Sequence, residues 1–275
     1  MVVQHNLTAM NSNRMLGVTT STQAKSTEKL SSGYKINRAA DDAAGLAISE
    51  KMRRQVRGLT QAVANAQDGI SAVQTAEGAL GEVHDMLQRM NELAVKAGTD
   101  TLQATDRDYI QSEVDALTAE INRVSATTTF NEQALLDGSF TGKKLQVGAE
   151  STATNQINMS IIAMSFSTIA GVVSISVDGA DGTKARASIE VVKTALKAVS
   201  KQRSDLGAVQ NRLEHTVKNL DNVVENTQAA ESQIRDTDMA EEMVRFANNN
   251  VLAQAGQSML AQANQSNQGV LSLLR

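Results

Sequence analysis

Residues 56–97 read VRGLTQAVANAQDGISAVQTAEGALGEVHDMLQRMNELAVKA, and this stretch decides the fold of the chain. Its apolar side chains recur at alternating steps of three and four residues, which is the spacing of a coiled-coil seam. They are Val56, Leu59, Val63, Ala66, Ile70, Val73, Ala76, Leu80, Val83, Leu87, Met90, Ala94 and Ala97. At a rise of about 1.5 Å per residue, a helix over these 42 positions extends for roughly 60 Å, so we predict one unusually long helix.

A second helix is expected directly after this one. The residues AGTDTLQA, 97–104, are turn material, so the second helix is predicted to fold back antiparallel. We expect it to begin at Thr105, whose hydroxyl can cap the amide near Asp108 in a capping-box arrangement. Its predicted apolar stripe consists of Ile110, Val114, Leu117, Ile121 and Val124.

Between the second helix and the rest of the chain, the pattern changes to short β-type segments. KLQVGAE, INMSIIAM and GVVSISVDG, within about 140–180, place β-branched residues in near alternation, which favours short strands or hairpins. A third long helix is predicted to open at Asp181 and to continue past a polar break at Arg203 to Ile234. The predicted fold is mainly α: a long antiparallel helical bundle or coiled-coil rod with a small β-hairpin region.

The two ends of the chain carry apolar helical faces that have no partner in this bundle. Residues 4–31 and 238–275 both have a helical pattern and are poor in charge at their extremities. Short amphipathic helices are marginal in water without a partner. We therefore expect the two terminal helices to pair with each other and to contact neighbouring molecules, which makes self-assembly a better hypothesis than a monomer.

The composition supports long helices and excludes several functions. The chain has 38 alanines, no proline and only 2% aromatic residues, which favours closely packed helices over a round core. The absence of cysteine excludes disulfides and thiolate metal sites. A net charge of −4 argues against a nucleic-acid partner, and no apolar run approaches the roughly 20 residues of a membrane span. The N-terminal sequence lacks the basic and apolar segments of a secretory signal, so we expect either a cytoplasmic protein or export without a cleaved signal.

Catalytic and metal-binding motifs are not found. The histidines lack metal-ligand spacing and are interpreted as ordinary helix-surface residues; they are His5, His84 and His215. The adjacent carboxylates Asp41–Asp42 and Glu241–Glu242 point away from each other on a helix, so we interpret them as solvated or helix-end charges. DGADG, 178–182, lacks the acidic ligands of a calcium loop and is predicted to be a turn. We predict no enzyme activity, no metal and no cofactor.

Several blocks of sequence carry a specific resemblance to a known family. On the N-terminal side they are LSSGYKINRAADDAAGLAIS, RGLTQAVANAQDGISAVQTAEGAL and LQRMNELAV. On the C-terminal side they are RSDLGAVQNRLEHTVKNL, RDTDMAEEM and LAQANQSNQGVLSLLR. Together they cover nearly all of residues 1–135 and 183–275, and through them the chain resembles bacterial flagellin in a short form without variable outer domains.

The resemblance implies a division into three segments. Residues 1–43 would form the N-terminal half of an inner coiled coil plus a connecting spoke, 44–235 a helical rod domain, and 236–275 the C-terminal half of the inner coiled coil. The helix end and the spoke map onto Ser31, Ser32, Gly33, Asn37, Asp41 and Asp42. On this view the joint lies near the N-terminus because only the two chain ends enter the inner domain.

The resemblance also implies a function and a set of partners. The expected role is a structural subunit that polymerises into the bacterial flagellar filament for motility, secreted unfolded through the flagellar type III apparatus. The expected partners are other copies of the chain, an export chaperone that wraps roughly residues 239–275, the filament cap and the hook-associated proteins. Neither a nucleic acid nor a membrane is expected as a partner. Inner-domain contacts are assigned to Val251, Leu252, Met259 and Leu260.

Host innate immune receptors are further partners that the resemblance implies. The family motif for Toll-like receptor 5 maps onto Arg89 and Leu93 in LQRMNELAV, with Glu113 in IQSEV. The sequence departs from the better-known pattern at Met90 and Asn91. Intracellular sensors of the NAIP class read the last apolar residues of the family, which match Val270, Leu271, Leu273 and Leu274; nearby, Asn267 stands where many relatives carry proline.

Three alternatives remain open at this point. A hook–filament junction protein would share the terminal helices, but its middle region is usually more elaborate. A flagellin with a metallopeptidase insert would need a zinc motif, and residues 136–182 contain no histidine. A non-flagellar coiled-coil adaptor would share the helical pattern and would stay monomeric when seeded with filament fragments.

Overall fold

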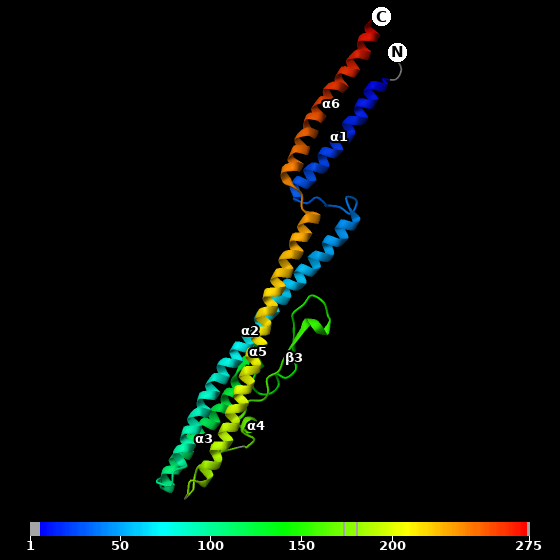
Figure 1. Ribbon diagram of the computed structural model, residues 1–275. Coiled ribbons are helices and arrows are strands. Elements are labelled where there is room, and N and C mark those ends of the chain that lie inside the picture. The colour runs from blue at the N-terminus through cyan, green and yellow to red at the C-terminus, as the bar shows by residue number, and fades with distance from the viewer. Residues whose placement is uncertain (1–5, 173, 180, 274–275) are drawn as a thin grey trace. The chain divides into compact units, whose positions relative to one another are not determined.

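The computed structural model describes residues 6–172, 174–179 and 181–273, with 267–273 as backbone only. The chain divides into two compact units, which we name the terminal unit (residues 1–56 and 225–275) and the core unit (residues 57–224). Figure 1 shows the elements of both units. Two of the longest helices contribute residues to both units.

Three long helices build the core unit. They are α2 (Ala43–Ala97), α3 (Ala104–Thr127) and α5 (Thr183–Arg235). The long helix predicted over 56–97 is confirmed, and α3 folds back along α2 after a short turn (Figure 1). The three helices bury their apolar stripes on one another, and the buried side chains include Val73, Leu80, Val83, Leu87, Val114, Ile121, Val192, Val199 and Leu206. The predicted seam is therefore the core of this unit.

The start of α3 differs from the prediction. The helix begins at Ala104, and the backbone N–H of Gln103 donates to Oδ2 of Asp106 over 3.1 Å. The backbone N–H of Asp106 donates in return to the carbonyl oxygen of Gln103, also over 3.1 Å. The prediction of a cap at Thr105 was wrong because the carboxylate of Asp106 supplies the capping acceptor, which places Thr105 inside the first turn.

The polar interruption of the third stripe has a structural explanation. Helix α5 is continuous through Arg203, and the seam position between Val199 and Leu206 belongs to Gln202, which is 5% exposed. The side-chain amide of Gln202 donates to the carbonyl oxygen of Ser160 over 3.1 Å. The predicted polar interruption of the stripe is therefore present, one residue earlier than expected: the buried side chain of Gln202 anchors the β region to the continuous helix at this level.

The β region contains two small antiparallel pairs. Strand β3 (Lys143–Gln146) pairs with β4 (Gln156–Met159), so that Lys143 lies opposite Met159. A short 3₁₀ helix, η1 (Ala153–Asn155), precedes β4. This pair confirms the predicted hairpin.

A second pair was not predicted. Strands β1 (Thr129–Phe130) and β2 (Gln133–Ala134) pair antiparallel. Asn131 and Glu132 join them with φ values of 49° and 63°. Two consecutive positive φ angles are what a two-residue hairpin turn requires, and asparagine at the first of them tolerates that conformation.

The expected strand in GVVSISVDG is absent from the parts of this segment that the structure describes, 171–172 and 174–179. Ile175 and Val177 are buried, which explains the alternating pattern. Their backbone groups are satisfied by the side-chain amide of Gln111 on α3: the N–H of Val177 donates to Oε1 over 2.6 Å, and Nε2 donates to the carbonyl oxygen of Ile175 over 2.9 Å. One side chain thus replaces a neighbouring strand.

The segment INMSIIAM is a strand only in its first half. Beyond β4 the chain makes single backbone hydrogen bonds, from the N–H of Ile161 to Phe140 and from the N–H of Met164 to Leu136. It then enters α4 (Phe166–Ala170), a short helix that the sequence did not predict, where the N–H of Phe166 donates to Oδ1 of Asn122 over 2.9 Å.

The terminal unit contains two further helices, α1 (Leu7–Ser32) and α6 (Met239–Leu273). They run side by side (Figure 1), and the side-chain amide of Asn6 donates to the carbonyl oxygen of Ala263 over 3.0 Å. The predicted pairing of the two chain ends is therefore confirmed.

Candidate assembly and recognition surfaces

The contact between α1 and α6 is a narrow seam of small residues. Among the described side chains, the buried apolar ones on these two helices are Ala9 and Ala253. A Cβ atom built on Gly256 would lie 3.3 Å from Cδ1 of Leu16, so the helices approach closely there because glycine has no side chain. A seam of this width removes little apolar surface from water.

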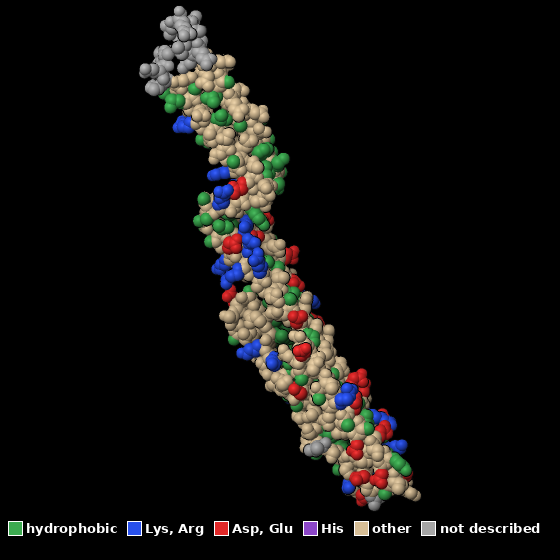
Figure 2. Space-filling model, turned by 180° about the vertical axis from the view of Figure 1, so that it is seen from behind, with side chains coloured by type: hydrophobic (Ala, Val, Ile, Leu, Met, Phe, Trp, Pro, Cys, Tyr) green, Lys and Arg blue, Asp and Glu red, His purple; other side chains and the backbone are tan. Residues whose placement is uncertain are grey.

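Most large apolar side chains of this helix pair point outward instead. Leu7, Met10, Met15 and Val18 on α1 are 54–68% exposed, and Val244, Val251, Leu252 and Met259 on α6 are 57–65% exposed. In Figure 2 the visible face of the pair carries hydrophobic side chains among uncharged polar ones. The sequence explains this, because Arg14 is the only charged residue between Leu7 and Gln23, and no charged residue lies between Arg245 and Arg275.

The four residues assigned to inner-domain contacts differ in their exposure to water. Val251, Leu252 and Met259 are among the exposed apolar side chains, and Leu260 is half-buried. The last apolar residues assigned to intracellular sensors, Val270, Leu271, Leu273 and Leu274, have side chains that lie outside the described residues.

The pair of adjacent glutamates on α6 corrects one prediction. Glu241 is exposed and pairs with Arg245. Both glutamates lie in the first turn of α6, as expected for helix-end charges, but Glu242 is only 5% exposed and is therefore not a solvated charge. It lines a cavity of about 380 Å³ together with Lys25 and Lys29 of α1, and Nη1 of Arg245 lies 3.9 Å from its Oε2. The cavity between the two helices is therefore lined by charged groups of both signs.

A connecting joint links the long helices to the terminal ones within the terminal unit. We define the joint as residues 33–42 and 236–238. Helix α1 ends at Gly33, whose φ of 76° is left-handed and whose N–H donates to Lys29 over 2.8 Å. Two backbone hydrogen bonds connect the two segments of the joint. The N–H of Lys35 donates to the carbonyl oxygen of Arg235, and the N–H of Thr237 donates to the carbonyl oxygen of Gly33.

Side chains of the joint complete these contacts. The guanidinium of Arg235 lies 4.6 Å from the centre of the Tyr34 ring and 2.9 Å from the carboxylate of Glu50. The hydrogen bond from Arg235 lowers the pKa of Glu50 below its ordinary value. The joint is thus held by one arginine that contacts an aromatic ring and a carboxylate at the same time.

The predicted spoke residues act mainly as local backbone partners. The carboxylate of Asp41 accepts from the N–H groups of Arg38 (2.9 Å) and Asn37 (3.2 Å), and these bonds lower its pKa. Asp42 accepts from the N–H of Gly45 and so caps the start of α2. The hydroxyl of Ser32 accepts from the N–H of Tyr34, whereas Ser31 is an exposed residue of the last turn of α1.

The three residues assigned to the host receptor lie together on α2 and α3. The guanidinium of Arg89 reaches Glu113 with Nε at 2.9 Å and Nη2 at 2.8 Å, and Nη1 lies 3.2 Å from Glu92. The hydrogen bond to Glu113 raises the pKa of Arg89. Both side chains of this pair are about half exposed, so the pair is available to a partner on the surface.

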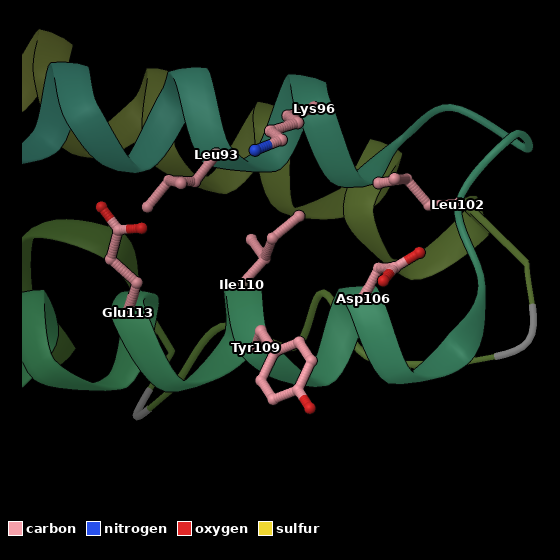
Figure 3. Close-up of a pocket in the computed structure, with 7 residues that line it drawn as sticks. All are labelled: Leu93, Lys96, Leu102, Asp106, Tyr109, Ile110 and Glu113. Carbon is pink, nitrogen blue, oxygen red and sulfur yellow. The ribbon is translucent and has the colours of Figure 1, made fainter.

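Leu93 is the buried member of these three residues. It is 2% exposed and forms part of the wall of a groove of about 430 Å³ between α2 and α3 (Figure 3). The other lining residues are Lys96, Leu102, Asp106, Tyr109, Ile110 and Glu113. Tyr109 points away from α2 and is 77% exposed. The side chain of Leu93 therefore packs inside the subunit, whereas Arg89 and Glu113 are about half exposed.

Arg107 is the residue that the sequence analysis missed. It is fully buried, and its guanidinium donates to the carbonyl oxygens of Ala97 (3.0 Å), Thr99 (2.8 Å) and Gly179 (3.2 Å). It therefore ties the turn after α2 to the turn before α5, where the predicted turn DGADG lies. Its burial could have been predicted from its spacing, since Arg107 precedes Ile110 by three positions and so falls on the apolar stripe of α3.

The described residues contain no group of three histidine, cysteine, aspartate or glutamate side chains that could hold a metal ion. Nor does any described helix combine the length and hydropathy needed to span a bilayer. His84 is half-buried beside Gln88, with their Nε2 atoms 2.9 Å apart, and His215 lines a polar cavity with Arg212; His5 lies outside the described residues.

The core unit is built from long helices that run antiparallel, and the terminal unit pairs two helices that are poor in charge and leave large apolar side chains exposed. These features together are typical of one class of protein, a helical subunit whose terminal faces are covered by other copies. The family comparisons agree. Residues 3–141 match the bacterial flagellin N-terminal helical region, and residues 189–274 match the bacterial flagellin C-terminal helical region. The chain belongs to the bacterial flagellin family.

Individual relatives support this assignment. The chain is 54% identical over 275 residues to a flagellin of Halalkalibacterium halodurans and 49% identical over 304 residues to a flagellin of Bacillus subtilis, with all of each chain covered in both cases. Its fold also resembles a solved chain described as a flagellar hook-associated protein from Vibrio parahaemolyticus, with a TM-score of 0.61 and 13% identity over 71% of this chain and 100% of that one. The last comparison shows a shared fold alone. The flagellin family consists of structural filament proteins and not of enzymes.

Proposed function

We propose that this chain is the structural subunit of a bacterial flagellar filament and serves motility. The observation that carries the proposal is the set of exposed apolar side chains on α1 and α6, which the narrow seam between the two helices leaves in water. Burial of such side chains contributes about 1.5–3 kcal/mol each, so lateral contact with further copies is strongly favoured. The alternative of a monomeric adaptor gives these faces no partner.

A double substitution tests the proposal. Val251→Asp with Leu252→Asp places two charges on positions that are 65% and 57% exposed in the subunit. The subunit should keep its helical content, whereas seeded polymerisation should slow by at least about tenfold, because assembly would bury unpaired carboxylates. Electron microscopy and sedimentation after seeding measure the effect.

The matched control is Val95→Asp on α2, which is 56% exposed in the core unit. It adds one such carboxylate away from the terminal helices and should leave the polymerisation rate within about twofold of the unchanged chain. If the double variant forms filaments at the normal rate, the terminal faces are not the assembly surface.

Secretion and the helper proteins belong to the same proposal. The subunit would be exported through the flagellar apparatus to an extracellular filament, and an export chaperone would cover the apolar side chains of residues 239–275 beforehand. The exposure of Met243, Val244 and Val251 supports this, because an uncovered face of this kind invites premature association. The filament cap and hook-associated proteins would contact the same subunits at the two ends of the filament.

Host recognition is proposed for a separate surface. Arg89 and Glu113 would contact Toll-like receptor 5 as an exposed ion pair, and Leu93 would serve from within the groove wall by shaping it. The apolar residues Val270 to Leu274 would be read by NAIP-class sensors. Arginine is frequent among the few interface residues that dominate binding energy, which supports the assignment of Arg89.

Replacement of Arg89 tests receptor recognition. Arg89→Ala should weaken receptor binding by about tenfold or more, while the stability of the subunit changes by less than about 1 kcal/mol, because the Arg89–Glu113 pair is exposed. Surface-binding measurements with the receptor ectodomain give the affinity. Arg123→Ala on α3, which removes only an exposed pair with Glu120, should bind normally. An unchanged affinity for Arg89→Ala removes this assignment.

A further inference from the structure

The methionines of this chain are divided sharply by exposure. Five of the methionines that the structure describes are exposed, and all five lie on α1 or α6: Met10 (64%), Met15 (54%), Met239 (47%), Met243 (56%) and Met259 (61%). In the core unit, Met90, Met159 and Met164 are at most 1% exposed, and Met86 is half-buried. The same chain therefore holds two populations of thioether that differ in their access to water.

Two of the exposed thioethers line one groove. Met15 of α1 and Met259 of α6 border a cavity of about 340 Å³, whose floor includes Leu16, Leu252 and Gly256. Leu252 is one of the residues on which the proposed assembly surface rests. The side chains that a small oxidant meets first are therefore part of the apolar face that other copies would cover.

We propose that these exposed thioethers are an oxidation site, and that their conversion to methionine sulfoxide blocks assembly of the free subunit. The oxidant class is a peroxide. The sulfur lone pair attacks one oxygen of hydrogen peroxide, an S–O bond forms and the O–O bond breaks. The departing hydroxide takes the proton of the transferred hydroxyl and leaves as water. Sulfur loses two electrons and the peroxide gains them, so the step needs no further reactant.

The composition directs the oxidant to these positions. The chain has no cysteine and no tryptophan, so no thiol competes with the thioethers for a two-electron oxidant. A sulfoxide is polar, and it replaces an apolar group that fills irregular contacts well. Burying the polar S=O group on assembly in place of an apolar thioether carries a desolvation cost, and α6 has no Lys or Arg between Arg245 and Arg275 to offer a charged donor.

The step is reversible in chemical terms, because sulfoxide reductases return methionine sulfoxide to the thioether. The part of the proposal that concerns assembly rests on the proposed function. It adds that filament formation itself shields the thioethers, so that only unassembled subunits are sensitive.

The experiment uses the full chain as soluble subunit and as filament, treated with hydrogen peroxide, quenched, digested with trypsin and analysed by mass spectrometry. Trypsin releases Met15 in MLGVTTSTQAK and Met90 in MNELAVK, each with one methionine directly after an arginine. In the soluble subunit the Met15 peptide should gain oxygen about tenfold faster than the Met90 peptide, since oxidation follows exposure. In filaments the two rates should become similar.

Assembly is measured on the same samples. Oxidised subunits should polymerise at least about tenfold more slowly on seeding, and treatment with methionine sulfoxide reductase should restore the rate. The variant Met15→Leu with Met259→Leu keeps the apolar volume without the sulfur. It should polymerise normally before treatment and be less sensitive to peroxide, whereas Met52→Leu, a half-buried position on α2, should be as sensitive as the unchanged chain.

Equal oxidation of Met15 and Met90 in the soluble subunit would overturn the site, and normal polymerisation of oxidised subunits would overturn its effect. These results are distinct from a failure of the proposed function. If untreated subunits do not polymerise on seeding, the filament role fails, and the rates of the two peptides still decide whether the oxidation site exists.

Discussion

Arg107 is the largest fully buried side chain among the described residues, and it closes one end of the core unit. Its five N–H donors have a fixed geometry and a permanent charge, so it can serve several carbonyl oxygens at once. Three carbonyls from two separate turns use this capacity. Asp100 adds charge compensation at 4.0 Å and pairs more closely with Arg186, at 2.8 Å.

Removing this guanidinium should destabilise the core unit strongly. Arg107→Leu keeps an apolar stem but leaves the carbonyls of Ala97, Thr99 and Gly179 without a donor, so we expect a loss of about 3 kcal/mol in the free energy of unfolding. Urea denaturation followed by circular dichroism measures it.

Arg123→Leu on the same helix is the control for Arg107→Leu. Arg123 forms only an exposed pair with Glu120 and should change stability by no more than about 0.5 kcal/mol. Equal midpoints for the two variants would show that the buried hydrogen bonds of Arg107 do not hold the two turns together.

Helix α2 carries two glycines whose surroundings differ, one packed against the β region and one in open space. A Cβ atom built on Gly69 would lie 2.6 Å from Cδ1 of Leu145 on β3, so the β3–β4 pair packs directly on the helix backbone there. A Cβ atom on Gly78 would meet nothing within 4 Å. The first glycine allows the hairpin to dock, and the second only lowers helix propensity.

The two alanine substitutions should therefore have opposite signs. Gly69→Ala should destabilise the core unit by about 1–3 kcal/mol, because Leu145 must move to make room. Gly78→Ala should stabilise it by about 0.8 kcal/mol through helix propensity alone. Thermal unfolding of both full-length variants gives the comparison. Stabilisation by Gly69→Ala would mean that the hairpin does not press on α2.

At the scale of the whole molecule, the two units differ in how they bury apolar residues. The core unit hides its stripes on three helices and the β region. The terminal unit pairs two helices along small residues and leaves its large apolar side chains exposed. A two-helix pair with so little burial opens readily, because local opening is least costly where few apolar contacts are lost.

Limited proteolysis tests this difference. Trypsin should cut the soluble subunit after Arg14 on α1 at least about tenfold faster than after Arg123 on α3, although both residues are exposed. In filaments, cleavage after Arg14 should slow to the level of Arg123, since neighbouring copies would cover α1. Trypsin could instead cut the soluble subunit after Arg14 no faster than after Arg123. That result would contradict the view that the terminal helices are stabilised only when neighbouring copies cover them.

The sites were less accessible to sequence reasoning than the helices. The match that selected Arg89 and Glu113 found two residues that do form a pair, but it gave no information on the burial of Leu93, which depends on α3 lying across it. The charge of Glu242 suggested solvent, whereas its side chain is 5% exposed and lines a cavity with residues of another helix, Lys25 and Lys29. The division at residues 43 and 235 into inner and rod segments stays a prediction.

The long helices could be predicted from the sequence alone, because apolar residues recur at intervals of three and four positions over many turns. Such a local period can be recognised without knowing what the helix packs against. The sequence also determined the antiparallel return after Ala97 and the charge-poor terminal faces. The tertiary structure was needed for the β1–β2 pair, for the partners of the remaining β-type segments and for the buried polar groups. The backbone partners of residues 175–177 come from Gln111, the seam position at Gln202 serves Ser160, and Arg107 joins two distant turns. Each of these depends on side chains far apart in the chain, whose proximity no local pattern encodes.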